Sequence, residues 1–169
     1  MKRFALPAVV LVIIAALLFW WLRPGAVTEK SDRSRDGLKG DVQSLTVETA
    51  PLVDRFGEFV EAARVTESQT SYSEDGKVLD IKRYRSDNTV DYAIRYDYEN
   101  NLLVSEETFD DNEAPLYKWL RDYNSRNLET SLSGYDGDGQ LDFRTVKEYD
   151  NRGQLFKETS FNPDETFSY

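Results

Sequence analysis

The chain has 169 residues, a net charge of −10 and neither Cys nor His. This composition excludes disulfides, thiolate metal sites and Cys nucleophiles, and it removes the usual zinc ligand and the Ser/His/Asp relay. From Thr46 to Tyr169 there are 14 Lys and Arg against 27 Asp and Glu, a net charge of −13. Such an acidic segment repels phosphate backbones, so no nucleic-acid partner is expected. It would attract cations or a basic protein surface.

The N-terminus carries an uncharged hydrophobic run from Phe4 to Leu22, directly after a basic start. As a helix, these 19 residues would rise about 28 Å, which matches one hydrocarbon core. Trp20 and Trp21 lie where interfacial aromatic residues are expected. Residues 1–22 are therefore predicted to be a transmembrane signal anchor that enters the membrane through residues 4–22. The alternatives are a cleaved signal peptide, whose hydrophobic core is usually shorter, and a buried core helix.

The orientation of the anchor has evidence on both sides. The basic start favours a cytoplasmic N-terminus, whereas the Lys and Arg residues between positions 23 and 35 favour the opposite. Because the anchor is typical of an export signal, we predict a single-pass inner-membrane protein with its C-terminal domain in the periplasm. Residues 23–45 are rich in Gly, Ser, Asp and Lys, which predicts a flexible polar linker. An acidic β-repeat domain would follow over residues 46–169.

Residues 50–65, APLVDRFGEFVEAARV, fit two patterns. Their apolar residues would form one face of a short amphipathic helix that covers an open side of a sheet. These are Leu52, Phe56, Phe59, Val60 and Ala63. The string VDRFGEF also fits the repeat described next, with Gly57 four residues after Val53. We favour the helix and keep the strand as the alternative.

A short repeat runs through the acidic domain. YSEDGKV from Tyr72, YDGDGQL from Tyr135 and YDNRGQL from Tyr149 align without gaps, with Gly four residues after the aromatic and an aliphatic residue six after it. Weaker copies begin at Tyr84, Tyr96, Phe109, Tyr123 and Phe161. Gly or Asn fills the fourth position after six of these eight aromatics, as a turn with positive φ requires. The aromatics are 12 to 14 residues apart, which suits one strand and one turn per copy.

This spacing predicts the fold class. Between turns the side chains alternate, as in Val90, Tyr92, Ile94 and Tyr96. Short turns make neighbouring strands antiparallel, so we predict an all-β fold, an antiparallel meander of tandem hairpin repeats in an open or curled single sheet. Every second turn then lies on the same side of the sheet. We call the side with the turns that follow Tyr84, Phe109, Tyr135 and Phe161 the acidic rim. Its carboxylates are Asp87, Asp91, Asp110, Asp111, Glu113, Asp136, Asp138, Asp142, Asp164 and Glu165.

The strings YDNRGQL and YDGDGQL resemble the YD-type (Rhs-like) repeats of exported bacterial proteins. The resemblance covers residues 72–169. It implies a β-meander scaffold in an exported protein and supplies no catalytic residues. Large Rhs-like proteins wrap many copies into a shell, whereas the roughly eight strands expected here form only an open or curled sheet.

Asp136, Asp138 and Asp142 are the metal candidates. They match the third, fifth and ninth positions of an EF-hand loop, where alternating oxygen ligands suit Ca²⁺. The first and twelfth positions are Gly134 and Thr145, so the leading Asp and the bidentate Glu are missing. We therefore expect Ca²⁺ binding to be weak at best, with turn formation as the alternative role, and we expect no other cofactor.

Aromatic and acidic residues offer further ligand or catalytic candidates. The repeat aromatics could form a carbohydrate platform, but packing on cross-strand neighbours is the expected role. Trp119, with Tyr117, is the exception and the candidate for partner contact. Glu106 and Glu107 are adjacent in a strand, so they point to opposite faces and cannot converge on one bond. We expect that the domain is not an enzyme, since a carboxylate hydrolase needs a cleft that short turns do not wall.

The expected function is a non-enzymatic interaction or scaffold module of the cell envelope, anchored in the membrane. Its contact surfaces would be the acidic rim and any exposed sheet edge, the latter through strand addition. The alternatives are an immunity or antitoxin-like protein that neutralises a basic toxin, and a weak Ca²⁺-binding envelope protein. The sequence does not identify the partner protein, and the charge favours a basic one.

Overall fold

The computed structural model describes residues 31–164 and 166–167, which belong to a unit that begins at Ser31. The predicted anchor and residues 23–30 of the predicted linker lie outside the described residues. Among the residues that are described, no helix is long and apolar enough to cross a membrane.

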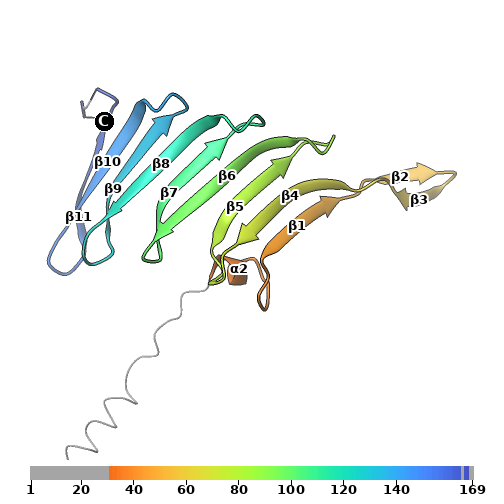
Figure 1. The fold of residues 1–169 in the computed structure, drawn as a ribbon, viewed down its shortest axis with the longest axis horizontal. Helices are drawn as coiled ribbons and strands as arrows, with labels where there is room; N and C mark the ends of the chain where they lie inside the picture. The colour runs from red at the N-terminus through yellow and green to blue at the C-terminus, as the bar shows by residue number, and fades with distance from the viewer. Residues whose placement is uncertain (1–30, 165, 168–169) are drawn as a thin grey trace, which may run out of the picture. The chain divides into compact units, whose positions relative to one another are not determined.

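Most of the described chain is strand. Its elements are α2 (Asp32–Arg35), β1 (Ser44–Thr49), β2 (Leu52–Arg55), β3 (Glu58–Glu61), β4 (Val65–Tyr72), β5 (Val78–Tyr84), β6 (Val90–Glu99), β7 (Leu102–Phe109), β8 (Pro115–Tyr123), β9 (Glu129–Asp136), β10 (Leu141–Tyr149) and β11 (Leu155–Phe161). Nine strands form one antiparallel sheet in the order β1-β4-β5-β6-β7-β8-β9-β10-β11 (Figure 1). β1 and β11 are its two edges, so the sheet is open. The predicted all-β antiparallel meander is confirmed.

Apart from the turn between β6 and β7, the turns that link successive strands from β4 to β11 share one construction, which the sequence repeat encodes. In the turn from Asp136 to Gln140, the Asp136 N–H donates to the fifth residue's carbonyl, and the fourth residue, Gly139, donates back to the Asp136 carbonyl, both at 3.0 Å. All six Gly and Asn residues predicted at the fourth position have positive φ. They are Gly76 (85°), Asn88 (64°), Asn100 (48°), Asn127 (60°), Gly139 (76°) and Gly153 (83°).

One copy of the repeat begins two residues later than predicted. The turn between β6 and β7 has only two central residues, Asn100 and Asn101, both at positive φ as a type I′ hairpin requires. The aromatic that precedes this turn is therefore Tyr98 rather than Tyr96. Tyr98 follows Tyr72 by 26 residues and precedes Tyr123 by 25, which restores the regular hairpin-pair spacing.

Glu113 occupies the fourth turn position after Phe109 and is held at a φ of 61°. This left-handed conformation costs an ordinary L-residue about 1–2 kcal/mol, and glycine adopts it readily. We expect Glu113→Gly to raise the free energy of unfolding by about 0.5–1 kcal/mol, because the exposed Arg95–Glu113 ion pair at 3.6 Å contributes little. Urea unfolding of the full chain in detergent measures the change.

The matched control for this prediction is Asn112→Gly, one residue earlier in the same turn. Asn112 is not among the described residues with positive φ. Glycine there should only increase the conformational entropy of the unfolded chain and so lower the free energy of unfolding. Equal effects of the two substitutions would show that backbone strain at Glu113 is not the cause.

A β-bulge follows each long turn and sets which face each repeat aromatic occupies. For example, Tyr135 pairs with Leu141 and Gly134 pairs with Phe143, so Asp142 is the extra residue. We define the front face as the one that carries Tyr96, Glu106 and Trp119, which pair across β6, β7 and β8, and the opposite face as the back face. From the strand register, the front face holds Tyr72, Tyr98, Tyr123 and Tyr149, and the back face holds Tyr84, Phe109, Tyr135 and Phe161.

The repeat aromatics pack within the sheet, as predicted. The Tyr123 hydroxyl donates to the Leu103 carbonyl at 2.8 Å, and the Tyr149 hydroxyl donates to the Glu129 carbonyl at 2.7 Å. Yet among the described residues only Tyr72 and Ala93 are apolar and buried, and no large side chain is fully buried. The sheet is therefore held mainly by its hydrogen-bond ladders and by side-chain pairs between neighbouring strands rather than by a second layer.

The helix favoured for residues 50–65 is not formed, and that prediction is wrong. The segment folds as the hairpin of β2 and β3, outside the nine-stranded sheet, and it joins β1 to β4. Phe56 and Gly57 form its turn with φ of 59° and 90°, and the Asp54 carboxylate accepts a hydrogen bond from the Gly57 N–H at 2.7 Å. The turn chemistry of Gly57 overrides the helical spacing of the apolar residues.

Part of the predicted flexible linker, residues 31–43, lies against the sheet. The Asp32 carboxylate accepts a hydrogen bond from the Val78 N–H at 3.1 Å. The Tyr72 hydroxyl donates to the Asp36 carboxylate at 2.6 Å. Polar side chains of the linker thus satisfy groups at the β4–β5 end of the sheet, so this part of the chain is not a free tether.

The Tyr72–Asp36 contact predicts a pH dependence. Burial, followed by the hydrogen bond to Asp36, raises the pKa of Tyr72 from 10.0 to about 12. Because the folded state holds this proton more tightly than the unfolded state, its contribution to stability is complete below pH 10 and is lost as the pH rises toward 12. We expect Tyr72→Phe to flatten the loss of stability over this range. Urea unfolding of the wild type and the variant at several alkaline pH values tests it, and equal slopes for the two chains would contradict it.

Candidate functional site

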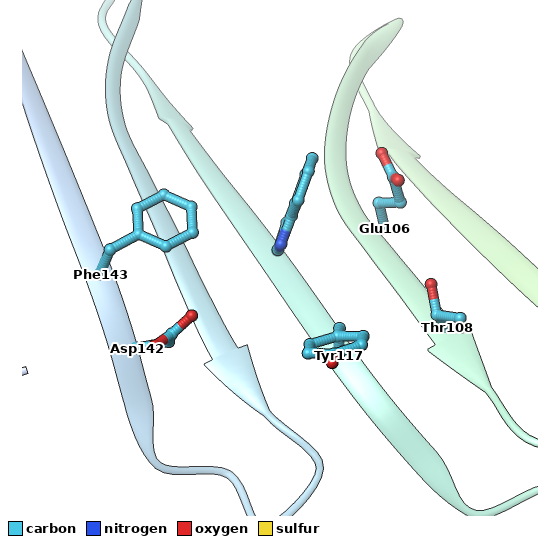
Figure 2. A pocket seen from close by; sticks show the side chains of 6 residues that line it. Glu106, Thr108, Tyr117, Asp142 and Phe143 are labelled. Atoms are coloured by element: carbon cyan, nitrogen blue, oxygen red, sulfur yellow. The ribbon is translucent and has the colours of Figure 1, made fainter.

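The front face carries a shallow depression of about 380 Å³ across β7, β8 and β10. We call it the aromatic depression, and its lining residues are Glu106, Thr108, Tyr117, Trp119, Asp142 and Phe143. Figure 2 shows Glu106 and Thr108 on one side, with Asp142 and Phe143 on the other. Tyr117 is 58% exposed and Trp119 is 39% exposed. The two residues that the sequence singled out for partner contact therefore lie together at an accessible surface.

Gly134 leaves room for the Phe143 ring, which lines one side of the depression. Gly134 of β9 pairs with Trp119 on one side and with Phe143 on the other. A Cβ at Gly134 would lie 2.2 Å from the Phe143 ring, so the ring occupies the space that a side chain would fill. Phe143 and Trp119 consequently meet edge to face across β9, with ring centroids 6.4 Å apart and an interplanar angle of 78°.

Asp142 reaches the same depression because of the bulge in β10. Adjacent residues of a regular strand point to opposite faces, but Asp142 is the bulged residue, and it lines the depression together with Phe143. No hydrogen bond or ion pair to its carboxylate is formed within residues 31–164 and 166–167. The depression thus combines exposed aromatic rings with a carboxylate that the described chain leaves available.

A row of alternating charges borders the depression on the front face. Arg121 of β8 lies 3.6 Å from both the Glu106 and the Glu129 carboxylates, and Lys147 of β10 lies 2.7 Å from Glu129. The hydrogen bond to Glu129 raises the pKa of Lys147 above its usual value. These side chains are between 15% and 26% exposed, which makes this the best-shielded ionic group of the described sheet.

Glu106 and Glu107 do point to opposite faces, as predicted. Glu106 faces Arg121 on the front, whereas Glu107 pairs with Lys118 on the back at 3.7 Å. The two carboxylates cannot act on one bond.

The acidic rim is formed, since the turns after Tyr84, Phe109 and Tyr135 lie on one side of the meander. Several of its carboxylates are engaged locally. Asp110 accepts hydrogen bonds from two backbone N–H groups of its own turn, which hold its pKa below the usual range. Arg85 bridges Asp91 and Asp111 at 2.9 Å and 3.0 Å. The rim therefore offers less free negative charge than its composition suggests. Glu165 lies outside the described residues.

The three metal candidates have separate surroundings. One Asp136 oxygen accepts hydrogen bonds from the N–H groups of Asp138 and Gln140, which caps the turn, and Asp142 lines the aromatic depression. The described residues contain no group of three or more acidic side chains placed to hold a metal ion. Weak Ca²⁺ binding at these residues stays a prediction. A Ca²⁺-dependent rise in melting temperature that Asp136→Asn and Asp138→Asn abolish would support it.

No family model matches the chain, and no curated protein matches it. Solved structures with some similarity include TcdB2-TccC3-TEV, at 14% identity and a TM-score of 0.40, over 84% of this chain and 10% of that one. A mutant of S. aureus TarM in complex with fondaparinux, alpha-GlcNAc-glycerol and UDP matches at 11% identity and a TM-score of 0.30, over 70% and 20%. The GtfA/B complex bound to UDP and GlcNAc matches at 16% identity and a TM-score of 0.26, over 57% and 22%.

The chain spans less than a quarter of the length of each of these three proteins. The prediction that this chain is not an enzyme is corrected at this point, because the matched structures include TarM and the GtfA/B complex, both solved with bound UDP. That prediction is withdrawn. TM-scores of 0.30 and 0.26 do not assign a catalytic activity to this chain.

Proposed function

We propose that this chain is an interaction module of the cell envelope, anchored in the inner membrane by residues 4–22, with its β-repeat sheet in the periplasm. The observation that carries the proposal is the single-layer, open sheet, whose front face holds the accessible aromatic depression. Apart from residues 31–43 at the β4–β5 end, the described chain places no second layer on the sheet, so its faces and edges are free for contact. Exposed aromatic residues are enriched where proteins meet. The resemblance to YD-type repeats of exported proteins supports the same role.

The β2–β3 hairpin supports the proposal independently. Phe56 at its tip is fully exposed, and Leu52 and Phe59 on its strands are largely exposed. An aromatic residue held at a positive φ of 59° is uncommon and costs conformational energy. An apolar tip kept in this conformation suits contact with a partner better than contact with water.

In-cell photo-crosslinking tests the interaction. The full chain carries the photoreactive p-benzoylphenylalanine in place of Tyr117 on the front face, or in place of Leu120 on the back face as the control. We expect a discrete protein adduct from position 117 and none, or a much weaker one, from position 120. Equal adducts from both positions, or none from position 117, would contradict a specific front-face contact.

The membrane topology has its own test, which is the protease accessibility of a C-terminal tag in spheroplasts with an intact inner membrane. Cleavage supports an exported sheet. Protection that is lost on lysis would place the sheet in the cytoplasm and remove the envelope part of the proposal.

An immunity-type role is the second proposal, supported by the net charge of −13 from Thr46 onward. An acidic surface of this kind complements a basic toxin. The crosslinked partner distinguishes the two, because a toxin would be made together with this chain and would be harmful without it.

A further inference from the structure

We propose that the aromatic depression binds a basic side chain, Lys or Arg, of a protein partner. This inference rests on the proposed interaction function and specifies the chemistry of the partner. A cation is attracted to the face of an aromatic ring, and an adjacent carboxylate adds a charge-assisted hydrogen bond.

The sheet itself shows this arrangement twice with its own cations. The Arg95 guanidinium lies 4.4 Å from the centroid of the Phe109 ring and 3.6 Å from the Glu113 carboxylate. The Lys77 ammonium lies 4.7 Å from the centroid of the Tyr98 ring and 3.7 Å from a carboxylate of its own turn. In both places one aromatic ring and one carboxylate share a basic side chain.

The aromatic depression has the same two components without the cation. Tyr117 and Trp119 present accessible ring surface, and Asp142 offers a carboxylate that no described cation pairs with. The Arg121 guanidinium lies 6.0 Å from the centroid of the Trp119 ring, at the outer limit for such contacts. It is already shared between two carboxylates of the charge row. A basic side chain from outside would complete the arrangement.

The charge of the whole domain favours this class of ligand over an anionic one. The net charge of −13 from Thr46 onward attracts a basic segment before contact. An anion would meet Asp142 and Glu106 at the depression with no described basic residue among its lining groups. A neutral sugar, which also stacks on aromatic rings, gains nothing from this charge, so it serves as the competing ligand in the test.

Isothermal titration calorimetry on the purified full chain in neutral detergent tests the inference. The probes are a peptide of alternating lysine and glycine, the same peptide with every lysine acetylated, and cellotetraose. We expect the lysine peptide to bind, and the acetylated peptide and cellotetraose not to bind. Asp142→Asn should weaken binding of the lysine peptide at least about fivefold, and Trp119→Leu by a similar factor.

The matched control is Asp138→Asn, which removes the same charge four residues away on the acidic rim and outside the depression. It should change the affinity for the lysine peptide by less than about twofold, since salt screens the attraction between exposed charges that are not in contact. Equal losses from Asp138→Asn and Asp142→Asn would overturn the inference, because attraction would then be general. Binding of cellotetraose in place of the lysine peptide, or no binding of either, would also overturn it.

The two proposals fail separately. If the purified chain shows no preference for the lysine peptide while position 117 still forms its adduct in cells, the ligand class is wrong and the interaction function stands. Loss of the adduct removes both.

Discussion

Replacing Gly137 by Ala should lower the free energy of unfolding by about 2 kcal/mol, because the added methyl group has no space. A Cβ at Gly137 would lie 2.4 Å from the Pro115 carbonyl oxygen and 3.4 Å from the Leu116 Cα. These are backbone atoms at the start of β8, so they cannot rotate away as a side chain would. The turn after β9 and the start of β8 would have to separate, which disturbs the pairing of two central strands.

Urea unfolding of the full chain in detergent, followed by far-ultraviolet circular dichroism, measures this loss. Asp138→Ala is the control, because it adds no atom to the same turn and removes a side chain with no described partner. Its effect should stay within about 0.5 kcal/mol. A Gly137→Ala variant as stable as the wild type would show that the two neighbouring turns of the rim are not in close backbone contact.

Replacing Arg121 by Met should also lower the free energy of unfolding by about 2 kcal/mol. The guanidinium lies between the Glu106 and Glu129 carboxylates, and its side chain is only 15% exposed. Without it, Glu106 is a half-shielded carboxylate with no counter-charge, whereas Glu129 keeps Lys147. We expect less than the full cost of breaking a buried ion pair, since the Arg121 Nη1 atom is buried and donates to no acceptor in the described chain.

A double-mutant cycle separates the charge effect from the packing effect. Glu106→Gln removes the uncompensated charge, so the Arg121→Met/Glu106→Gln variant should be more stable than Arg121→Met alone. Additive losses from the two substitutions would show that Arg121 acts through its packing against neighbouring strands and not through the charge row.

The turns were predictable because their chemistry is local. Gly and Asn adopt positive φ at little cost, so their regular spacing predicted six turn positions correctly. Glu113 adopts the same conformation without any propensity for it, and only its place in the hairpin-pair spacing indicates the turn. That spacing also points to Tyr98 rather than Tyr96, and the shorter Asn100–Asn101 turn explains the two-residue shift.

The aromatic depression was only partly predictable. Trp119 and Tyr117 stand out in the sequence as an atypical aromatic pair, and strand alternation places them on one face. Asp142 and Phe143 share that face because a bulge interrupts the alternation, and the register of a bulge is a property of the paired strands. Gly134 was the remaining signal, since a glycine inside a strand pattern indicates a close approach by another group.

The hairpin of residues 52–61 shows where periodicity misleads. The apolar residues of this segment recur at helical spacing, yet the two-residue turn at Phe56 and Gly57 fixes a hairpin whose apolar side chains stay exposed. Apolar residues at helical spacing predict a helix with one buried face. A single-layer sheet offers little interior in which such a face could be buried, so the spacing alone does not decide between helix and hairpin.

The absence of Cys from the chain permits the most direct test of the central claim, that a partner covers the front face. Single variants Tyr117→Cys and Leu120→Cys place one thiol on the front face or on the back face, and both are labelled with a membrane-impermeant maleimide in intact spheroplasts and again after purification in detergent. We predict that position 120 is labelled equally in both conditions, whereas position 117 is protected in spheroplasts and labelled after purification. Equal labelling of position 117 in spheroplasts and in the purified chain would contradict a partner on the front face.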